Sequence, residues 1–136
     1  MTVRIGIVGT SWWTDSMYLP ALADHPHGSV VAVCGRNRTT AERLADEWGV
    51  PQVFTSWEEM VDPAIIDAVV VASANDTHVP VARAALEAGI HVLCEKPIAL
   101  TAAEATSLAA AAAEHPDLAT MVPFTYRYMP MFAATK

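Results

Sequence analysis

Two short stretches of this 136-residue chain hold residues whose types and spacing can support chemistry. Residues 9–14, Gly-Thr-Ser-Trp-Trp-Thr, follow a β-branched run and lead into a helical pattern. Residues 95–97, Glu-Lys-Pro, follow another such run. There the ammonium group of Lys96 can hold a hydroxyl or polarise a carbonyl, with Glu95 fixing its position and charge. The alternative for this pair is an ordinary turn with both charges in water.

The first stretch is a partial match to the dinucleotide-binding turn G-x-G-x-x-G/A. In that motif the glycines permit a tight turn, close approach of the pyrophosphate and close helix packing. Only Gly9 remains, because Ser11 and Thr14 replace the second and third glycines. The Ser11 hydroxyl and the free N–H groups of the helix N-terminus can still bind phosphate. The motif alone leaves two readings open, a phosphate-binding turn that includes Thr10 or a turn with no ligand.

Residues 35–38, Gly-Arg-Asn-Arg, bear on which nucleotide such a turn would take. An NAD-specific site places Asp or Glu here to accept the ribose 2′-hydroxyl. This chain offers Gly35 without a side chain, then Arg36, Asn37 and Arg38. Cations suit a 2′-phosphate, so the segment favours NADP(H), with NAD(H) as the second choice. The structural alternative is a solvated helix start.

The elements that would position these residues alternate along the chain. Six β-branched runs predict strands at 3–8, 29–34, 52–55, 67–73, 90–94 and 118–124, and helical patterns fill 14–24, 39–48, 56–61, 79–88 and 101–115. Runs that are apolar at every residue indicate strands covered on both faces. We therefore predict a single α/β domain, a doubly wound, mostly parallel six-stranded sheet in the order 3-2-1-4-5-6.

Local signals support these boundaries. Gly49 and Gly89 are predicted to end helices in the left-handed conformation. Thr101 with Glu104 predicts a capping box. Cys34 and Cys94 would end strands 2 and 5, too far apart for a disulfide, and are predicted to be small core residues.

Composition narrows the class of protein. A hydrophobic fraction of 53% with 17% charged residues excludes intrinsic disorder. The net charge of −7 argues against nucleic acid as the main partner. No apolar run reaches the roughly 20 residues of a membrane span, and the N-terminus lacks a signal-peptide pattern. Two cysteines without a disulfide framework fit the cytoplasm. The histidines show no metal-ligand spacing, so no metal is predicted.

Several motifs together resemble a known family. They are Ile-Gly-Ile-Val-Gly-Thr at 5–10, Leu-Pro-Ala-Leu at 19–22, Asp-Ala-Val-Val-Val-Ala at 67–72, Asn75, His78, Ala-Gly-Ile-His-Val-Leu-Cys-Glu-Lys-Pro at 88–97 and Arg-Tyr-Met-Pro at 127–130. The chain resembles the N-terminal domain of the Gfo/Idh/MocA group, which includes glucose–fructose oxidoreductase and inositol dehydrogenase. The Glu-Lys-Pro unit after its strand is the most specific of these motifs.

The resemblance implies a pyridine-nucleotide oxidoreductase acting on sugars, cyclitols or related polyols and carbonyl compounds. Lys96 would bind the reacting oxygen, and Glu95 would support Lys96 and the nicotinamide end. Arg127 would face the nicotinamide and substrate pocket. Trp12 and Trp13 match a turn position beside the cofactor. Trp12 would contact the cofactor or, alternatively, lie in the core or an interface.

The loop after the fourth strand adds further candidates for cofactor contact: Ser73, Ala74, Asn75 and His78. Ala74 stands where the family commonly has proline. Asn75 would either bind the cofactor or cap the next helix. His78 is counted with this loop, although its more favoured role is structural, with its ring satisfied by a backbone group.

The family also suggests how the chain is organised. Residues 1–123 would be the NAD(P)-binding Rossmann domain, and residues 124–136 would begin the connection to a substrate domain that is absent here. The chain alone would then be inactive, and its apolar C-terminal segment would favour a homo-oligomer. The rival hypothesis is a nucleotide-sensing or interaction module that kept the fold without catalysis.

Overall fold

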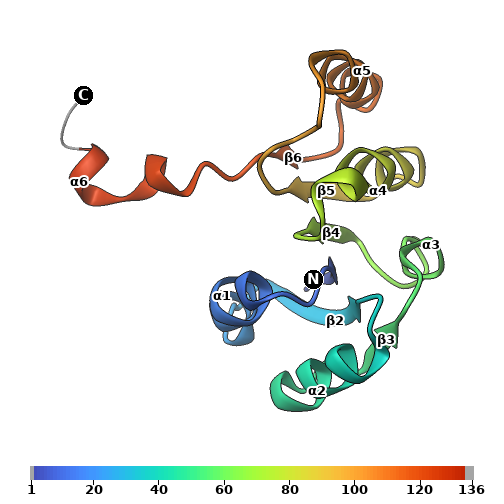
Figure 1. The fold of residues 1–136 in the computed structure, drawn as a ribbon, viewed down its shortest axis with the longest axis vertical. Coiled ribbons are helices and arrows are strands. Elements are labelled where there is room, and N and C mark those ends of the chain that lie inside the picture. Colours follow the sequence, from blue (N-terminus) through green and yellow to red (C-terminus); the bar gives the residue numbers. More distant parts are fainter. Residues whose placement is uncertain (1, 134–136) are drawn as a thin grey trace.

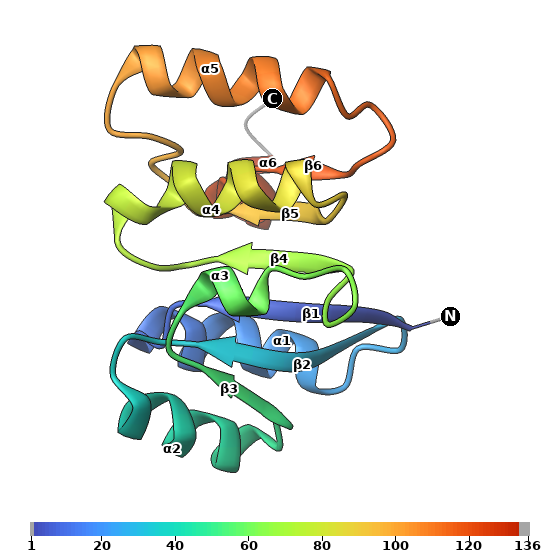
Figure 2. The ribbon, with the colours of Figure 1, turned by 90° about the vertical axis from the view of Figure 1, so that its right-hand side faces the viewer.

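Six strands pair into one sheet in the computed structural model, which describes residues 2–133. They are β1 (Val3–Val8), β2 (Gly28–Cys34), β3 (Gln52–Phe54), β4 (Ala68–Val71), β5 (His91–Cys94) and β6 (Thr120–Met121). Their order is β3-β2-β1-β4-β5-β6, and Figure 2 shows them side by side. Every neighbouring pair is parallel. The predicted doubly wound α/β fold is confirmed.

Helices cover the two faces of the sheet (Figure 1). On one face lie η1 (Thr14–Tyr18), a π-helical segment, α1 (Leu19–Ala23) and α2 (Arg38–Trp48). On the other lie α3 (Trp57–Met60), α4 (Asn75–Glu87) and α5 (Ala102–Ala113). The core on the first face contains Leu19 and Leu44, and the core on the second face contains Met60 and Leu86. Because β4 contributes to both, its residues are apolar without alternation.

The predicted helix ends are confirmed. Gly49 and Gly89 have φ of +66° and +76°, so both adopt the left-handed conformation. The Thr101 side chain accepts a hydrogen bond from the Glu104 N–H, and the Glu104 carboxylate accepts one from the Thr101 N–H. This reciprocal pair satisfies N–H groups that the first turn of α5 leaves without a helical partner.

Both cysteines are free and buried, as predicted. Burial raises the pKa of the Cys34 thiol to about 11 and that of Cys94 to about 12. Neither side chain is therefore a thiolate near neutral pH.

Three predicted boundaries are wrong. The helix expected at residues 79–88 begins at Asn75, four residues earlier, and carries Pro80 inside it. The strand expected at 118–124 is only Thr120–Met121, because this edge strand pairs with β5 alone. The first helix is interrupted by the π-helical segment η1, which an amphipathic pattern over so few residues does not reveal.

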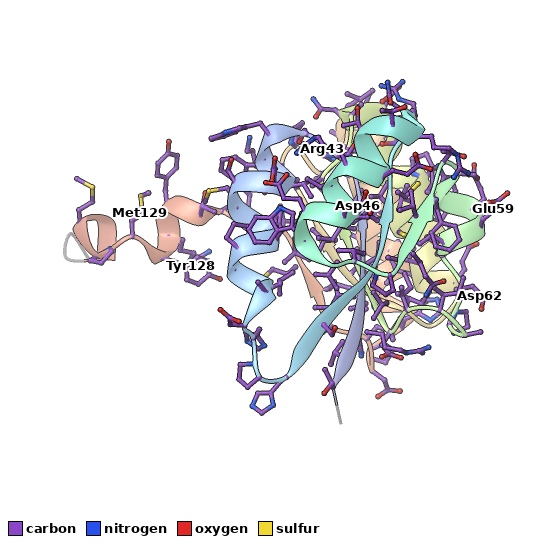
Figure 3. All side chains as sticks on the ribbon, turned by 90° about the horizontal axis from the view of Figure 1, so that it is seen from below. Arg43, Asp46, Glu59, Asp62, Tyr128 and Met129 are labelled. Atoms are coloured by element: carbon purple, nitrogen blue, oxygen red, sulfur yellow. The ribbon has the colours of Figure 1, made fainter. Side chains whose placement is uncertain are left out.

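The chain leaves the sheet after β6 through η2 (Thr125–Tyr128) and α6 (Pro130–Ala133). Phe124, Tyr128 and Met131 are exposed on this segment. Figure 3 shows Tyr128 and Met129 standing away from the rest of the molecule. Of the predicted connecting segment 124–136, residues 134–136 lie outside the described residues. Within residues 2–133, no helix has the length and apolar character needed to cross a membrane.

Candidate functional site

The segments singled out from the sequence meet at the carboxyl edge of the sheet. Backbone hydrogen bonds extend the parallel pairing one residue past the strand ends. The Gly9 N–H donates to Cys34 O at 2.8 Å, and the Glu95 N–H donates to Val71 O at 2.9 Å. The Gly35 N–H likewise donates to the Phe54 carbonyl at 3.0 Å. The first residues after β1, β2 and β5 therefore lie in a row along one edge, where open α/β sheets bind ligands.

The turn after β1 needs its remaining glycine. Gly9 has φ of +118°, and a Cβ atom there would stand 2.3 Å from the Ala72 carbonyl oxygen. The Thr14 side chain, which replaces the third motif glycine, is buried and donates its hydroxyl hydrogen to the Gly9 carbonyl at 2.9 Å. Thr14 thus closes the turn from the helix side. Helical backbone begins at Trp12, so the first N–H groups of this helix lie directly after Ser11.

A cleft of about 720 Å³, here called the wide lobe, lies beside this turn. Its lining contains Val8, Gly9, Thr10, Ser11, Cys34, Gly35, Arg36, Asn37, Thr55, Ser56, Trp57, Glu58, Ala72, Ser73, Ala74 and Thr77. It thus brings together eight of the predicted candidates from three loops: Gly9, Thr10, Ser11, Gly35, Arg36, Asn37, Ser73 and Ala74. Asn37 is also the N-cap of α2, since its Oδ1 accepts a hydrogen bond from the Thr40 N–H at 3.0 Å.

A smaller cleft of about 190 Å³, the lysine lobe, adjoins the wide lobe. The two share Ser11, Ala72 and Ser73. The lysine lobe is also lined by Trp13, Asn75, His78, Glu95 and Lys96. Lys96 is exposed, whereas the neighbouring Glu95 is only 6% exposed. Lys96 and the turn after β1 therefore lie at the same cleft, while phosphate binding by the turn and catalysis by Lys96 stay predictions.

The partners of Glu95 differ from those expected. Among the described residues no ion pair joins Glu95 to Lys96. Instead, the Trp13 indole N–H and the Tyr18 hydroxyl both donate to Glu95 Oε1 at 2.7 Å. The Lys96 backbone N–H donates to Oε2 at 3.0 Å. Glu95 therefore acts on Lys96 through the backbone and ties that loop to the first helix.

Tyr18 is suited to this donor role. Burial, then the hydrogen bond to Glu95, raises the pKa of its phenol well above the ordinary value. The hydroxyl group therefore keeps its proton and remains a donor across the physiological range.

The ring of His78 contacts backbone groups, as favoured from the sequence. It is 1% exposed, and its ring lies between two backbone carbonyls, with Nδ1 2.8 Å from Pro97 O and Nε2 3.2 Å from Ser73 O. The ring therefore bridges the loop after β4 and the Lys96–Pro97 turn. Asn75 does not cap the helix, because the N-cap residue of α4 is Ala74, whose side chain makes no capping hydrogen bond. For Asn75, cofactor contact remains a prediction.

Three predicted residues line neither lobe in the described structure. Trp12 is 70% exposed, so the core alternative for it is wrong, and its ring lies 5.9 Å from that of Trp13. Arg38 is exposed and pairs with Glu42 at 3.3 Å. Arg127 is exposed on η2, in the segment beyond β6.

Two contacts and two further residues at the site were not predicted. Trp13 and Tyr18 reach Glu95 across 82 and 77 positions of sequence. The loop after β3 adds Trp57 and Glu58 to the wide lobe. A hydrogen bond from the Ser56 hydroxyl lowers the pKa of Glu58, which keeps it ionised. The only sequence signal for Trp57 and Glu58 was that they follow a strand that ends at the same edge of the sheet.

The geometry agrees with the comparisons to known proteins. Residues 3–123 match the Gfo/Idh/MocA family, described as an oxidoreductase family with an NAD-binding Rossmann fold. The chain belongs to this family. The predicted resemblance is therefore confirmed. The family match covers the whole sheet, from β1 to β6, and both lobes of the cleft.

Relatives within the family include dehydrogenases and a reductase. The chain is 33% identical over 129 residues to D-xylose 1-dehydrogenase (NADP(+)) 2 of Haloferax volcanii, covering 95% of this chain and 39% of that protein. A scyllo-inositol dehydrogenase from Lactobacillus casei, solved with NAD(H) and scyllo-inositol, superposes with a TM-score of 0.93 at 29% identity, over 99% of this chain and 40% of that one. A 3-ketoreductase from Actinomadura kijaniata, solved with TDP-benzene and NADP, gives 0.90 at 29% identity, over 99% and 42%.

These relatives are longer proteins. The chain spans about two fifths of each of them. They also differ in the nucleotide bound, since one was solved with NAD(H) and another with NADP. The comparisons therefore support a nicotinamide cofactor without choosing between the two forms.

Proposed function

We propose that this chain is the NADP(H)-binding part of an oxidoreductase that transfers hydride between nicotinamide and a sugar, a cyclitol or a related polyol or carbonyl compound. The observation that carries the proposal is a pair of adjoining clefts at the carboxyl edge of the sheet. They share Ser11 of the turn after β1, with Arg36 in the wide lobe and Lys96 in the lysine lobe. The named activities of the relatives support the substrate class.

The residues of the turn fit a dinucleotide. Because Gly9 carries no side chain where a Cβ would meet Ala72 O, the turn after β1 can pack closely against the backbone that follows β4. The Ser11 hydroxyl and the N–H groups that follow it supply donors, and the helix N-terminus favours negative charge. Arg36 supplies a cation for a 2′-phosphate in the wide lobe.

In the lysine lobe, Lys96 is the candidate catalytic residue. When bound, the nicotinamide supplies a carbon that accepts or donates hydride. The Lys96 ammonium would hold the reacting substrate oxygen and stabilise the charge that develops there. Glu95, held by Trp13 and Tyr18, would fix the backbone of Lys96 through its N–H. His78 would hold the next residue through the Pro97 carbonyl.

We also propose that segment 124–133 leads into the part of the protein that binds substrate. Exposed apolar side chains at Phe124, Tyr128 and Met131 support this, since such surface is usually covered. Residues 2–123 would then form the cofactor-binding domain. Arg127 would reach the substrate pocket only within that larger arrangement.

The nucleotide preference is tested by titrating the chain with NADPH and NADH and following tryptophan fluorescence. We expect saturable binding that is tighter for NADPH. Replacing Arg36 with alanine should weaken NADPH binding roughly tenfold or more and leave NADH nearly unchanged. Arg43→Ala is the matched control, because Arg43 lies on α2 outside the cleft and pairs with Glu47. Equal affinities for both nucleotides, unaffected by Arg36→Ala, would remove the NADP(H) preference.

The catalytic role of Lys96 is tested on the whole protein. Lys96→Ala should lower kcat by about 10²-fold or more while changing the Kd for the nucleotide little. This separation is expected because the ammonium group acts on the reacting oxygen and the nucleotide is held mainly by the wide lobe. Wild-type turnover by Lys96→Ala would refute the assignment.

A further inference from the structure

The π-helical segment η1 brings two hydrogen-bond donors to one side of the first helix. Trp13 and Tyr18 are five positions apart, and in an ordinary α-helix such residues point about 140° away from each other. In η1 the backbone hydrogen bonds join residues five positions apart, as the bond from the Leu19 N–H to the Thr14 carbonyl shows. Residues at this spacing therefore lie on the same side of the helix, and both donors reach the same atom, Glu95 Oε1.

Glu95 connects this helix to the loop that carries Lys96. Its Oε1 accepts both side-chain bonds from the helix, at 2.7 Å each, and its Oε2 accepts the Lys96 N–H at 3.0 Å. Each carboxylate oxygen is thus bonded to a different segment. Because Glu95 is almost fully buried, water cannot readily replace a lost partner. A displacement of the helix is therefore transmitted to the Lys96 backbone through one planar group.

The other end of this series of bonds is the turn after β1. The helix that contains η1 begins at Trp12, directly after Ser11, and Ser11 lines both lobes. Tyr18 lines neither lobe in the described structure. A ligand held by the turn can thus move Lys96 without entering the lysine lobe, because the helix and Glu95 join the two.

We propose that η1 is a coupling element: when the turn after β1 binds the diphosphate of the nucleotide, η1 carries the change to Lys96 through Glu95. Trp13 and Tyr18 are then positioning residues for Lys96. This inference rests on the proposed function, because it concerns how the nucleotide prepares the same lysine. It gives Tyr18, which lies outside both lobes, a part in the proposed reaction.

A second hydrogen bond of η1 supplies a matched control. Asp15, within the same segment, accepts a hydrogen bond from the Trp48 indole N–H at 2.9 Å, and Trp48 belongs to α2. Trp48→Phe therefore deletes a bond between η1 and a carboxylate, as Tyr18→Phe does, but leaves the partners of Glu95 in place. Within the described residues, Trp48 also lines neither lobe. The two variants should lose similar stability and differ in their effect on Lys96.

The first readout is the backbone amide resonance of Lys96 in the chain labelled with ¹⁵N-lysine. The sequence has two lysines, Lys96 and Lys136, and the Lys96 resonance is the one missing from Lys96→Ala. ADP is the probe, because it carries the diphosphate and has no nicotinamide to enter the lysine lobe. We expect ADP to shift the Lys96 resonance equally in the wild type and Trp48→Phe, and clearly less in Tyr18→Phe. Trp13→Phe, which removes the other donor, repeats the comparison if Tyr18→Phe does not fold.

The second readout is turnover by the whole protein. Tyr18→Phe should lower kcat about tenfold and change the KM for the nucleotide little, because a misplaced ammonium group acts on the reacting oxygen and not on nucleotide binding. Trp48→Phe should keep the wild-type kcat. In a Lys96→Ala background, Tyr18→Phe should lower kcat no further, since the group that it positions is absent.

The inference is overturned if ADP shifts the Lys96 resonance as far in Tyr18→Phe as in the wild type, or shifts it in neither while the Gly9 resonance responds. Equal losses of kcat in Tyr18→Phe and Trp48→Phe would also overturn it, since they would reflect stability alone. Failure of Gly9 to respond to ADP and to NADPH, or wild-type turnover by Lys96→Ala, would instead contradict the proposed function. The two kinds of failure are therefore distinguishable.

Discussion

At the scale of single residues, the site is organised by hydrogen bonds to Glu95. This carboxylate is almost fully buried, yet it has three donors: an indole N–H, a phenol hydroxyl and a backbone N–H. A buried carboxylate is tolerated only when its oxygens are bonded in this way. Because the last donor is the Lys96 N–H, the same bonds that satisfy Glu95 also fix the start of the lysine loop.

The Tyr18 bond to Glu95 can be tested by removing one hydroxyl group. Tyr18→Phe keeps the ring and deletes a 2.7 Å hydrogen bond to a charged acceptor. We expect the free energy of unfolding to fall by roughly 1.5–3 kcal/mol, measured by urea denaturation. Tyr128→Phe is the control, because Tyr128 is 67% exposed and loss of its hydroxyl group should change stability little. Equal stability of Tyr18→Phe and the wild type would show that Trp13 alone suffices.

At the scale of elements, hydrogen bonds at the starts of the strands help to hold the sheet together, at the edge opposite the cleft. The Arg4 guanidinium holds Asp67 through Nη2 at 2.6 Å and Nε at 3.1 Å, and the Arg4 N–H donates to the same carboxylate at 2.7 Å. Arg4 also donates to the carbonyls of Pro63 and Ala64. This group of bonds joins the start of β1 to the loop that leads into β4, at the edge opposite the cleft.

Stability contributed by Asp67 should depend on pH. The Arg4 side chain, and then its backbone N–H, hold the pKa of Asp67 below the ordinary value. A lowered folded-state pKa stabilises the fold above the unfolded-state pKa of about 3.9, and this contribution is lost as pH falls through the folded-state value. Asp67→Asn should therefore lower Tm by a few degrees at pH 7 and by progressively less below about pH 4.

The comparison requires Tm of both chains at pH 7, 5 and 3. Asp46→Asn is the control, because Asp46 is exposed on α2 (Figure 3). It should produce no comparable difference that varies with pH. A Tm difference for Asp67→Asn that stayed constant from pH 7 to 3 would contradict the role of the ionised carboxylate.

The sequence predicted elements better than the contacts between them. The six strands were predicted from short β-branched runs between helical patterns, and their order from the doubly wound fold that this alternation indicates. The run in β4 is apolar at every residue because that strand is covered on both faces. The start of α4 was missed because Pro80 usually marks a helix beginning. Here Pro80 is exposed, and the buried His78 and Val81 on either side hold the helix against the sheet.

At the site too, positions after strands could be predicted from the sequence, but contacts between distant residues could not. Gly9, Gly35 and Lys96 were predictable because each follows a strand at one edge. The bonds of Trp13 and Tyr18 to Glu95 were not, since they join positions far apart in sequence and have no local pattern. The close approach of Thr10 to Gly35, where a Cβ atom built on the glycine would stand 2.6 Å from the Thr10 side chain, also required coordinates.

At the scale of the whole molecule, the two edges of the sheet differ in chemistry. The carboxyl edge holds the cleft, with Gly9 and Gly35 in its wide lobe. The opposite edge holds the start of β2 at Gly28 and the helix ends at Gly49 and Gly89, which precede β3 and β5. The backbone amide resonances of these glycines can therefore show which edge of the sheet binds a ligand.

Nucleotide binding at the carboxyl edge is the central claim, and amide NMR spectra of the chain labelled with ¹⁵N-glycine test it most directly. The chain has six glycines, and the spectra are followed during titration with NADPH and NADH. We predict saturable shifts of the Gly9 and Gly35 resonances, with those of Gly28, Gly49 and Gly89 nearly unchanged. Unchanged Gly9 and Gly35 resonances at saturating nucleotide, or shifts confined to the opposite edge, would contradict the account.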